Sequence, residues 1–243
     1  MEWYESFAGK AVVVTGASSG IGRETALAFA AAGARVGLVA RRTLPLEEVR
    51  HEIERHGGTA QVLPCDVTHE ASVQAALGAA AERLGPLDVV VNNAGLLIPG
   101  SIEALRAEDL QAMLDVNLFG ALYVMRAAVA HMRTRGSSGD GCVVNVASLA
   151  GRRGLTPLGG YCASKFALIG MTEALRTELR GSGIHVALVE PGVVDTPMAQ
   201  TASAEMAFVE QWPEALQMPP SWVVWAIFAA ARFRLTEISV PPG

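Results

Sequence analysis

The chain of 243 residues is half hydrophobic (51%) and carries a net charge of −5 without a long run of one sign. Its length and apolar content suffice for one large α/β domain, and the lack of a clustered basic segment argues against nucleic acid as a partner. The three cysteines, Cys65, Cys142 and Cys162, have neither disulfide-framework nor metal-ligand spacing, so we expect no metal site and a reducing, cytoplasmic location. We also expect no membrane partner, because the late apolar run 222–233 falls well short of the ~20 residues that span a bilayer.

Short runs rich in β-branched residues alternate with alanine-rich segments of helical length. These runs are 11–16, 35–40, 60–67, 87–95, 141–148, 185–192 and 237–241. Strands that are apolar throughout are covered on both faces, so the alternation predicts α/β architecture, a doubly wound (Rossmann) parallel sheet of about seven strands. No change in composition divides the chain, and we expect a single domain over residues 1–243. Residues 133–141 are interpreted as a solvent-exposed connector.

The first predicted strand runs into the sequence TGASSGIG, residues 15–22, before a helix. The candidate cofactor-binding residues in this turn are Gly16, Ser18, Ser19, Gly20, Ile21 and Gly22. Glycines permit a tight turn and let backbone N–H groups approach a pyrophosphate, which the positive end of the helix then stabilises. The position of this turn, after the first strand, predicts a dinucleotide-binding site.

The residues after the second strand indicate which dinucleotide binds. A unit that selects NAD has an Asp or Glu near this strand end for the ribose 2′-hydroxyl, whereas arginine suits a 2′-phosphate. Here Ala40 takes the acidic position and Arg41 and Arg42 follow. The alternative is that both arginines are only solvated surface. We expect NADP, with NAD as the less favoured cofactor.

Two further strand ends carry candidate cofactor contacts. Asp66, followed by Val67, closes the third strand, where its carboxylate can accept a hydrogen bond from the adenine amino group. Asn93, Ala94 and Gly95 close the fourth strand in a turn of small residues that leaves room for a ribose or nicotinamide. Individually these residues are typical of turns and helix caps. Their shared position at one edge of the sheet favours a ligand site.

Ser148 closes the fifth predicted strand, and Tyr161 and Lys165 begin the next helix. Residues four apart lie on one face of a helix, so Tyr161 and Lys165 project side by side. The unperturbed pKa of tyrosine is near ~10, and a nearby ammonium moves it toward the working pH by stabilising the phenolate. With a serine to hydrogen-bond the substrate oxygen, the pair predicts a proton-transfer site. Cys162 points about 100° away from Tyr161 and is expected to be packing.

The segment from Val193 to Pro220 reads as irregular and contains Met198, Met206, Phe208, Trp212 and Met218. Loops beyond the carboxyl ends of the strands bind ligands in such sheets, so we expect a substrate lid around 193–220. Further apolar residues, Leu96, Leu97, Ile98, Leu149 and Leu155, predict an apolar pocket. Arg152 and Arg153 are interpreted either as contacts for an anionic substrate or, with more weight, as a solvated loop.

Taken in chain order, these motifs resemble the short-chain dehydrogenase/reductase family, in its single-domain branch. The motifs are TGASSGIG, NNAG, Asn117 in LDVNLFG, Ser148, YCASK and VEPGVVDT, and they cover essentially the whole chain. The resemblance implies an oxidoreductase that interconverts a ketone or aldehyde and an alcohol.

The resemblance also implies roles for individual residues. Tyr161 is the proton donor or acceptor, Ser148 positions the substrate oxygen, and Lys165 lowers the tyrosine pKa and binds the nicotinamide ribose. Asn117 interrupts a helix and holds a water that connects the lysine to solvent. The segment with Pro191, Gly192, Val194 and Thr196 contacts the nicotinamide carboxamide. Arg41 matches the arginine of NADP-preferring members, whereas Ser19 replaces a basic residue that some of them carry.

The same resemblance implies a homodimer or homotetramer, with dimer contacts on the helices near Asn117 and Tyr161. Our leading hypothesis is an NADP-preferring oxidoreductase for a small-molecule carbonyl or alcohol, with Tyr161 as general acid/base. The alternative is a non-catalytic NADP-binding sensor or scaffold protein. A sugar-nucleotide epimerase and an enoyl reductase are disfavoured, because the glycine spacing and the tyrosine–lysine spacing, respectively, differ from those families.

Overall fold

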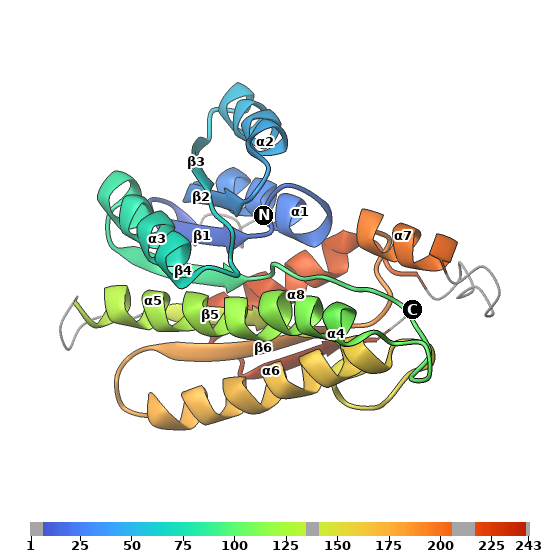
Figure 1. Ribbon diagram of the computed structural model, residues 1–243. Coiled ribbons are helices and arrows are strands. Elements are labelled where there is room, and N and C mark those ends of the chain that lie inside the picture. The colour runs from blue at the N-terminus through green and yellow to red at the C-terminus, as the bar shows by residue number, and fades with distance from the viewer. Residues whose placement is uncertain (1–6, 135–140, 206–216, 242–243) are drawn as a thin grey trace.

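The computed structural model describes residues 7–134, 141–205 and 217–241 (Figure 1). Its strands are β1 Ala11–Thr15, β2 Arg35–Ala40, β3 Thr59–Pro64, β4 Leu87–Asn92, β5 Cys142–Val146, β6 His185–Pro191 and β7 Glu237–Val240. Its helices are α1 Gly20–Ala31, α2 Thr43–Arg55, α3 Glu70–Leu84, α4 Ala107–Leu114, α5 Ala121–Arg133, α6 Gly159–Glu178, α7 Pro197–Glu205 and α8 Pro220–Phe233. A π-helical turn, η2 Asp115–Gly120, joins α4 to α5, and a 3₁₀ turn, η4 Leu149–Gly151, follows β5.

The strands form one seven-stranded sheet in the order β3-β2-β1-β4-β5-β6-β7, and every neighbouring pair is parallel. The doubly wound sheet predicted from the sequence is therefore confirmed. The order reverses between β1 and β4, and ligands bind outside the carboxyl ends of the strands at such a point.

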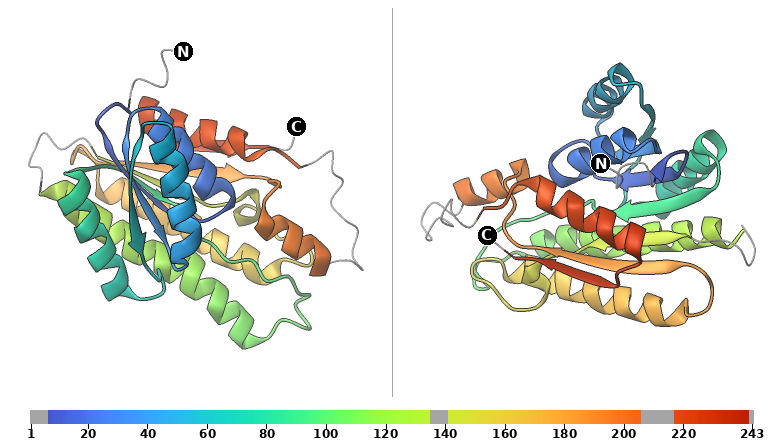
Figure 2. Two further views of the ribbon diagram at one scale, coloured as in Figure 1. Left: turned by 90° about the horizontal axis from the view of Figure 1, so that it is seen from above. Right: turned by 180° about the vertical axis from the view of Figure 1, so that it is seen from behind.

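Helices cover both faces of the sheet, as Figures 1 and 2 show. Successive side chains of a strand point to opposite faces. In β1, Val12 and Val14 pack into the core beneath α1, α2 and α8, whereas Ala11 and Val13 pack into the core beneath α3, α5 and α6. All four are fully buried. This double burial is why the strand is apolar at every position.

Six of the seven strands end one to three residues earlier than their apolar runs predict, and β4 and β5 show the consequence for the site. The fourth run was expected to continue to residue 95, but β4 ends at Asn92, and the fifth was expected to reach residue 148, but β5 ends at Val146. The residues beyond both ends leave the sheet and line a cavity at its carboxyl edge. Small and polar residues that follow a buried strand here serve the cavity rather than the sheet.

Part of the segment that the sequence indicates to be irregular forms the helix α7, Pro197–Glu205. Val194 and Met218 form an isolated parallel bridge, in which Met218 N donates to Val193 O at 2.8 Å and Asp195 N donates to Met218 O at 3.0 Å. The bridge ties both ends of the segment together beside β6. Met206, Phe208 and Trp212 lie outside the described residues, as does most of the predicted connector 133–141.

The helical run Ala107–Arg133 is long and apolar enough to cross a membrane by length and composition. Half of its most apolar window is buried inside the fold, where α5 packs against α3 and β4, as a core helix does.

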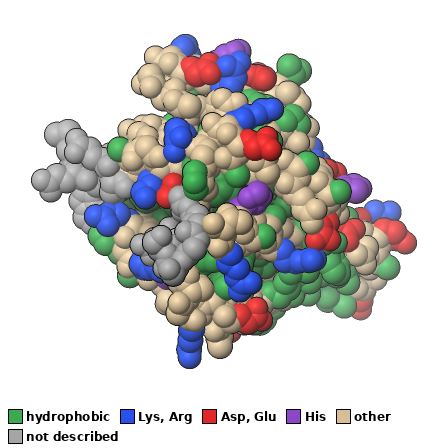
Figure 3. Space-filling model, turned by 90° about the vertical axis from the view of Figure 1, so that its left-hand side faces the viewer, with side chains coloured by type: hydrophobic (Ala, Val, Ile, Leu, Met, Phe, Trp, Pro, Cys, Tyr) green, Lys and Arg blue, Asp and Glu red, His purple; other side chains and the backbone are tan. Residues whose placement is uncertain are grey.

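Figure 3 shows one end of the molecule, on which basic and acidic side chains are interspersed. Among the described residues, no group of three or more His, Cys, Asp or Glu is placed to hold a metal ion.

Candidate active site

The glycine turn after β1 leaves little space for a side chain at its three glycines. Gly16 and Gly20 have φ of +69° and +51°, a region that L side chains rarely adopt. A Cβ on Gly22 would lie 2.3 Å from Gly16 O, so the first turn of α1 sits directly against the loop. Ser19 precedes this helix without a side-chain capping hydrogen bond, which leaves the N-terminal N–H groups for another acceptor. These features fit a pyrophosphate bound at the helix end.

Thr15, which sequence reasoning missed, fastens this turn to the end of β4. Its Oγ1 accepts hydrogen bonds from Asn93 N at 2.9 Å and from Ala94 N at 3.0 Å. Asn93 Nδ2 in turn donates to Thr15 O at 3.0 Å. The signal in the sequence was a hydroxyl residue at the last position of a buried strand. The two strand ends on either side of the topological switch are thus held in one arrangement.

The ends of β2 and β3 form the far end of the cavity. Arg41 and Arg42 are exposed there, and in the part of the chain the structure describes neither makes an ion pair. Asp66 Oδ1 accepts hydrogen bonds from Thr68 N at 3.0 Å and Thr68 Oγ1 at 2.8 Å. Burial opposes ionisation of Asp66, but these hydrogen bonds and the nearby Arg41 hold its pKa below the usual value. The carboxylate is therefore ionised, and the two arginines remain available to an anion.

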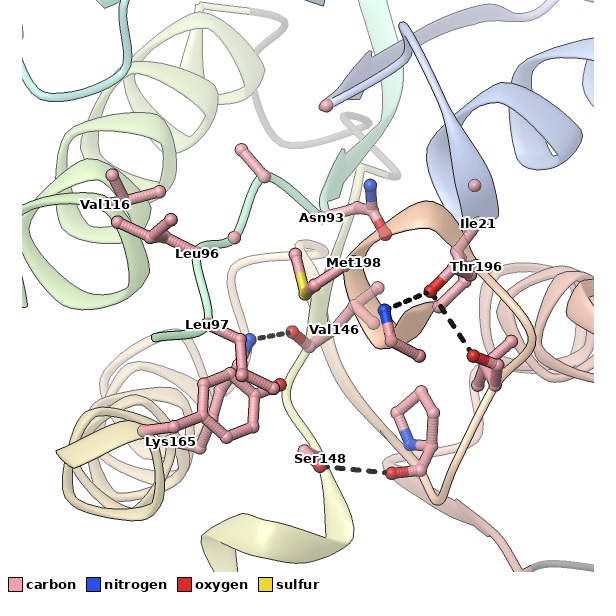
Figure 4. Close-up of a pocket in the computed structure, with 18 of the residues that line it drawn as sticks. Ile21, Asn93, Leu96, Leu97, Val116, Val146, Ser148, Lys165, Thr196 and Met198 are labelled. Atoms are coloured by element: carbon pink, nitrogen blue, oxygen red, sulfur yellow. Dashed lines mark hydrogen bonds between the residues drawn. The ribbon is translucent and has the colours of Figure 1, made fainter. Parts of the chain in front are cut away.

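Ser148 is held at the start of the 3₁₀ turn after β5. Its Oγ accepts a hydrogen bond from Ala150 N at 3.1 Å and donates to Pro191 O at 3.2 Å (Figure 4). The hydroxyl therefore joins the end of β5 to the segment after β6. Thr196 continues that segment, and its methyl group would lie 3.2 Å from a Cβ on Gly20. This places the predicted carboxamide contacts next to the glycine turn.

Tyr161 and Lys165 lie on the buried face of α6, with 9% and 4% of their surfaces exposed. Lys165 Nζ donates to Val146 O at 3.0 Å and lies 5.7 Å from the centroid of the Tyr161 ring (Figure 4). Burial raises the pKa of Tyr161 to about 12, although a hydrogen bond with Ser148 acts in the opposite direction. Burial also lowers the pKa of Lys165 to about 8.

These directions differ from the expectation that Lys165 lowers the tyrosine pKa. The physical reason is that both groups are removed from water, which favours the neutral forms of each, while the ammonium is directed at the Val146 carbonyl. The phenol is therefore protonated at neutral pH in this arrangement. Cys162, as expected, is packing: its side chain is 3% exposed and accepts a hydrogen bond from Leu155 N.

Asn117 lies in η2, so the helix is interrupted where the resemblance implies. Its Oδ1 accepts a hydrogen bond from Leu96 N at 2.7 Å, and its Nδ2 donates to Leu96 O at 2.8 Å and to Ser164 Oγ at 2.9 Å. Ser164 Oγ donates to Tyr161 O at 2.7 Å. Both amide hydrogens are thus used to join the chain after β4 to the helix that carries Tyr161.

One cavity of about 670 Å³ joins all these strand ends. Every predicted catalytic or cofactor-binding residue lines it except Gly22, which lies under the turn, and Asn117, which is fully buried behind Leu96. Figure 4 shows Leu96, Leu97 and Val116 on one side of the cavity, Ile21 and Thr196 on the other, and Met198 between them. Leu149, Leu155 and Leu158 add to the apolar lining.

The fold and this cavity define an α/β protein that binds a dinucleotide at the carboxyl edge of its sheet. A family model described as short chain dehydrogenase matches residues 10–207. The chain is 35% identical to the ketoacyl reductase HetN of Nostoc, over 96% of this chain and 78% of that protein. It is 39% identical to the 3-ketodihydrosphingosine reductase of Bos taurus, over 78% of this chain but only 58% of that enzyme.

A solved structure agrees with these relatives. The crystal structure of a short-chain type dehydrogenase/reductase from Mycobacterium marinum superposes with a TM-score of 0.89 at 31% identity, covering 97% of this chain and 95% of that one. The chain therefore belongs to the short-chain dehydrogenase/reductase family. It is an NAD(P)-dependent oxidoreductase that acts on CH–OH groups or the corresponding carbonyls of small molecules.

Proposed function

We propose that this enzyme is an NADP-preferring carbonyl reductase in which Tyr161 is the general acid. The observation that carries the proposal is that the half-buried Ser148 and the buried Tyr161 and Lys165 line one cavity together with the glycine turn. Two relatives are named as reductases of keto compounds. A sensor or scaffold protein that binds NADP without catalysis would not need Ser148, Tyr161 and Lys165. No contact among the described residues favours this alternative.

A nicotinamide dinucleotide held by the glycine turn and the strand ends would supply the hydride for reduction, or take it up in the reverse direction. The chain's own residues handle the oxygen. Ser148 Oγ accepts from Ala150 N and donates to Pro191 O in this structure, so its one hydroxyl hydrogen would turn from Pro191 O to the carbonyl oxygen to orient it. Tyr161, which is protonated at neutral pH, would give that oxygen its proton. Lys165 carries a positive charge next to the phenol and binds the ribose, and the apolar wall excludes water.

NADP preference rests on the charges around the end of β2. Arg41 and Arg42 are exposed lining residues that form no ion pair within 4 Å among the described residues, although Arg41 is near enough to Asp66 to lower its pKa, and the acidic position is taken by Ala40. Guanidinium groups bind a phosphate through paired, charge-assisted hydrogen bonds, whereas a 2′-hydroxyl gains less from them. Residues Gly16 to Gly20 would hold the pyrophosphate, and Asn93 to Gly95 the adjacent ribose.

Four further expectations stay predictions. Residues 193–220 act as the substrate lid, with α7 and its Met198 facing the cavity. The chain acts as a single domain in the cytoplasm. It assembles as a homodimer or homotetramer. Phe119 in η2 and Phe166 in α6 are 41% and 45% exposed, and these two elements pack against each other, so both rings are available for apolar contacts with a second subunit.

The substitution Tyr161→Phe tests the proposed role directly. It removes only the phenolic hydroxyl, so we expect kcat for ketone reduction to fall about 100-fold or more, the usual contribution of a general acid. Fluorescence titration with NADPH should give a Kd close to that of the wild type, because the glycine turn is unchanged. Cys162→Ser is the matched control next to it in α6. Near-normal turnover by Tyr161→Phe would contradict the assignment, and binding without turnover by the wild type on any carbonyl would favour the sensor alternative.

A further inference from the structure

Two adjacent arginines after η4 have different surroundings. Arg152 Nε donates to Glu190 Oε1 at 2.6 Å, Nη2 donates to Glu237 Oε1 at 2.7 Å, and Nη1 lies 3.5 Å from Glu173 Oε1. This guanidinium is neutralised by carboxylates on three elements. Arg153 is exposed and lines the cavity, and across the described residues it has no ion-pair or hydrogen-bond partner. The sequence alone could not separate the two.

Among the described residues, the charged side chains that line the cavity come from three parts of the fold. They are Arg41, Arg42 and Asp66 at the ends of β2 and β3, Lys165 on α6, and Arg153 in the segment between η4 and α6. The first three lie at the strand ends assigned to the cofactor, and Lys165 is directed at Val146 O. Among the described residues, Arg153 is the remaining charged residue that lines the cavity. The one acidic lining residue in the described part of the chain is Asp66, which lies at the cofactor end.

The segment that carries Arg153 belongs to the substrate end of the cavity. Its far end pairs with the chain after β4, where Gly100 N donates to Pro157 O at 2.8 Å. Leu155 and Leu158 of this segment pack with Leu96 and Leu97 beside Tyr161. The wall next to the reacting oxygen is therefore apolar, and among the described residues Arg153 is the exposed cation that lines the cavity on this side, apart from the buried Lys165. An apolar wall that ends in an unpaired guanidinium suits a ligand with an apolar body and an anionic group.

We propose that Arg153 selects carbonyl substrates that carry a carboxylate or phosphate on an apolar chain. This inference rests on the proposed reductase function and names the substrate class of the same site. A guanidinium binds either anion through paired hydrogen bonds, and a neutral ester of the same shape loses this interaction. Arg153 acts on specificity and takes no part in the proton or hydride transfer.

The test compares each acid with its neutral counterpart. Oxodecanoates with the ketone at different distances from the carboxylate are reduced with NADPH, each beside its methyl ester, and the corresponding oxoalkyl phosphates distinguish carboxylate from phosphate. We expect the wild type to prefer the acid over its ester in kcat/KM for at least one position of the ketone. In Arg153→Gln that preference should fall about fivefold, mainly through KM, as for a charged pair at a partly exposed site.

The control is Arg180→Gln, which removes an exposed arginine just beyond the opposite end of α6 and should retain the wild-type preference. Equal handling of acid and ester by the wild type, reduction of other ketones but none of the anionic ones, or an undiminished preference in Arg153→Gln would each overturn the proposal. These outcomes leave the reductase function standing. Loss of activity on every carbonyl compound would instead contradict the reductase function itself.

Discussion

At the scale of single residues, the ionisation of Lys165 sets a testable pH dependence. Burial lowers its pKa to about 8, so the ammonium is present below that pH and is lost above it. If this charge is needed beside the phenol, kcat/KM for reduction should be level on the acidic side and fall about tenfold per pH unit above about 8. Tyr161 contributes nothing to this fall, because its pKa is raised to about 12 and it stays protonated.

The measurement is a pH–rate profile for ketone reduction at saturating NADPH, with protein integrity followed by circular dichroism. Oxidation of the corresponding alcohol should instead be governed by Tyr161 and rise with pH toward about 12, because its first step needs the phenolate. A reduction rate that stays level up to about pH 10, near the ordinary lysine pKa of ~10.4, would mean that the charge on Lys165 is not required.

At the scale of the elements, the ion pair between Arg152 and Glu190 holds η4 against β6. Glu190 is fully buried and also accepts a hydrogen bond from Ser239 Oγ of β7 at 3.1 Å. Arg152→Met leaves this carboxylate without its charged partner. We expect the free energy of unfolding to fall by about 3 kcal/mol, at the lower end for buried pairs because Arg152 is 40% exposed.

Urea unfolding followed by tryptophan fluorescence measures this loss. The double variant Arg152→Met with Glu190→Gln should recover much of it, since the unpaired charge is gone. Arg106→Met removes an exposed pair with Asp109 and should cost no more than about 1 kcal/mol. Equal losses for the two single variants would refute the distinction between the buried and the exposed pair. Ser148 Oγ donates a hydrogen bond to Pro191 O, and Pro191 follows Glu190. Loss of the ion pair between Arg152 and Glu190 should therefore also raise KM for the carbonyl.

The secondary-structure elements also show which parts of the fold could be predicted from the sequence and which could not. Apolar runs predicted the strands and their parallel arrangement, because burial on both faces leaves a clear pattern, and nearly all the predicted site residues line the cavity. The helix α7 was missed, since the small side chains of PMAQTASAE lack a clear apolar periodicity. The pairing of Arg152 with Glu190 joins residues 38 apart and depends on how β5 and β6 align, which no local pattern contains. The contacts of Thr15 with residues 93 and 94 depend in the same way on the neighbouring strands β1 and β4.

At the scale of the whole molecule, cofactor binding should raise thermal stability and report cofactor choice. The cavity joins the ends of six strands, so a dinucleotide bound there cross-links both halves of the sheet. A ligand at about 100 times its Kd stabilises the folded state by about 2.7 kcal/mol. For a chain of this size that corresponds to a rise in Tm of about 5–10 °C. If the arginines bind the 2′-phosphate, NADPH should raise Tm by several degrees more than NADH at equal concentration.

Replacing both Arg41 and Arg42 with alanine should remove that difference while keeping the smaller shift by NADH, because the glycine turn and the pyrophosphate contacts are untouched. Differential scanning fluorimetry of the wild type, the double variant and Arg55→Ala provides the comparison. Arg55 is an exposed arginine at the opposite end of α2 from Arg42 and should leave both shifts unchanged. A double variant in which the NADPH and NADH shifts fall equally would identify the two arginines as solvated surface. The preference for NADP would then have to come from another part of the cavity.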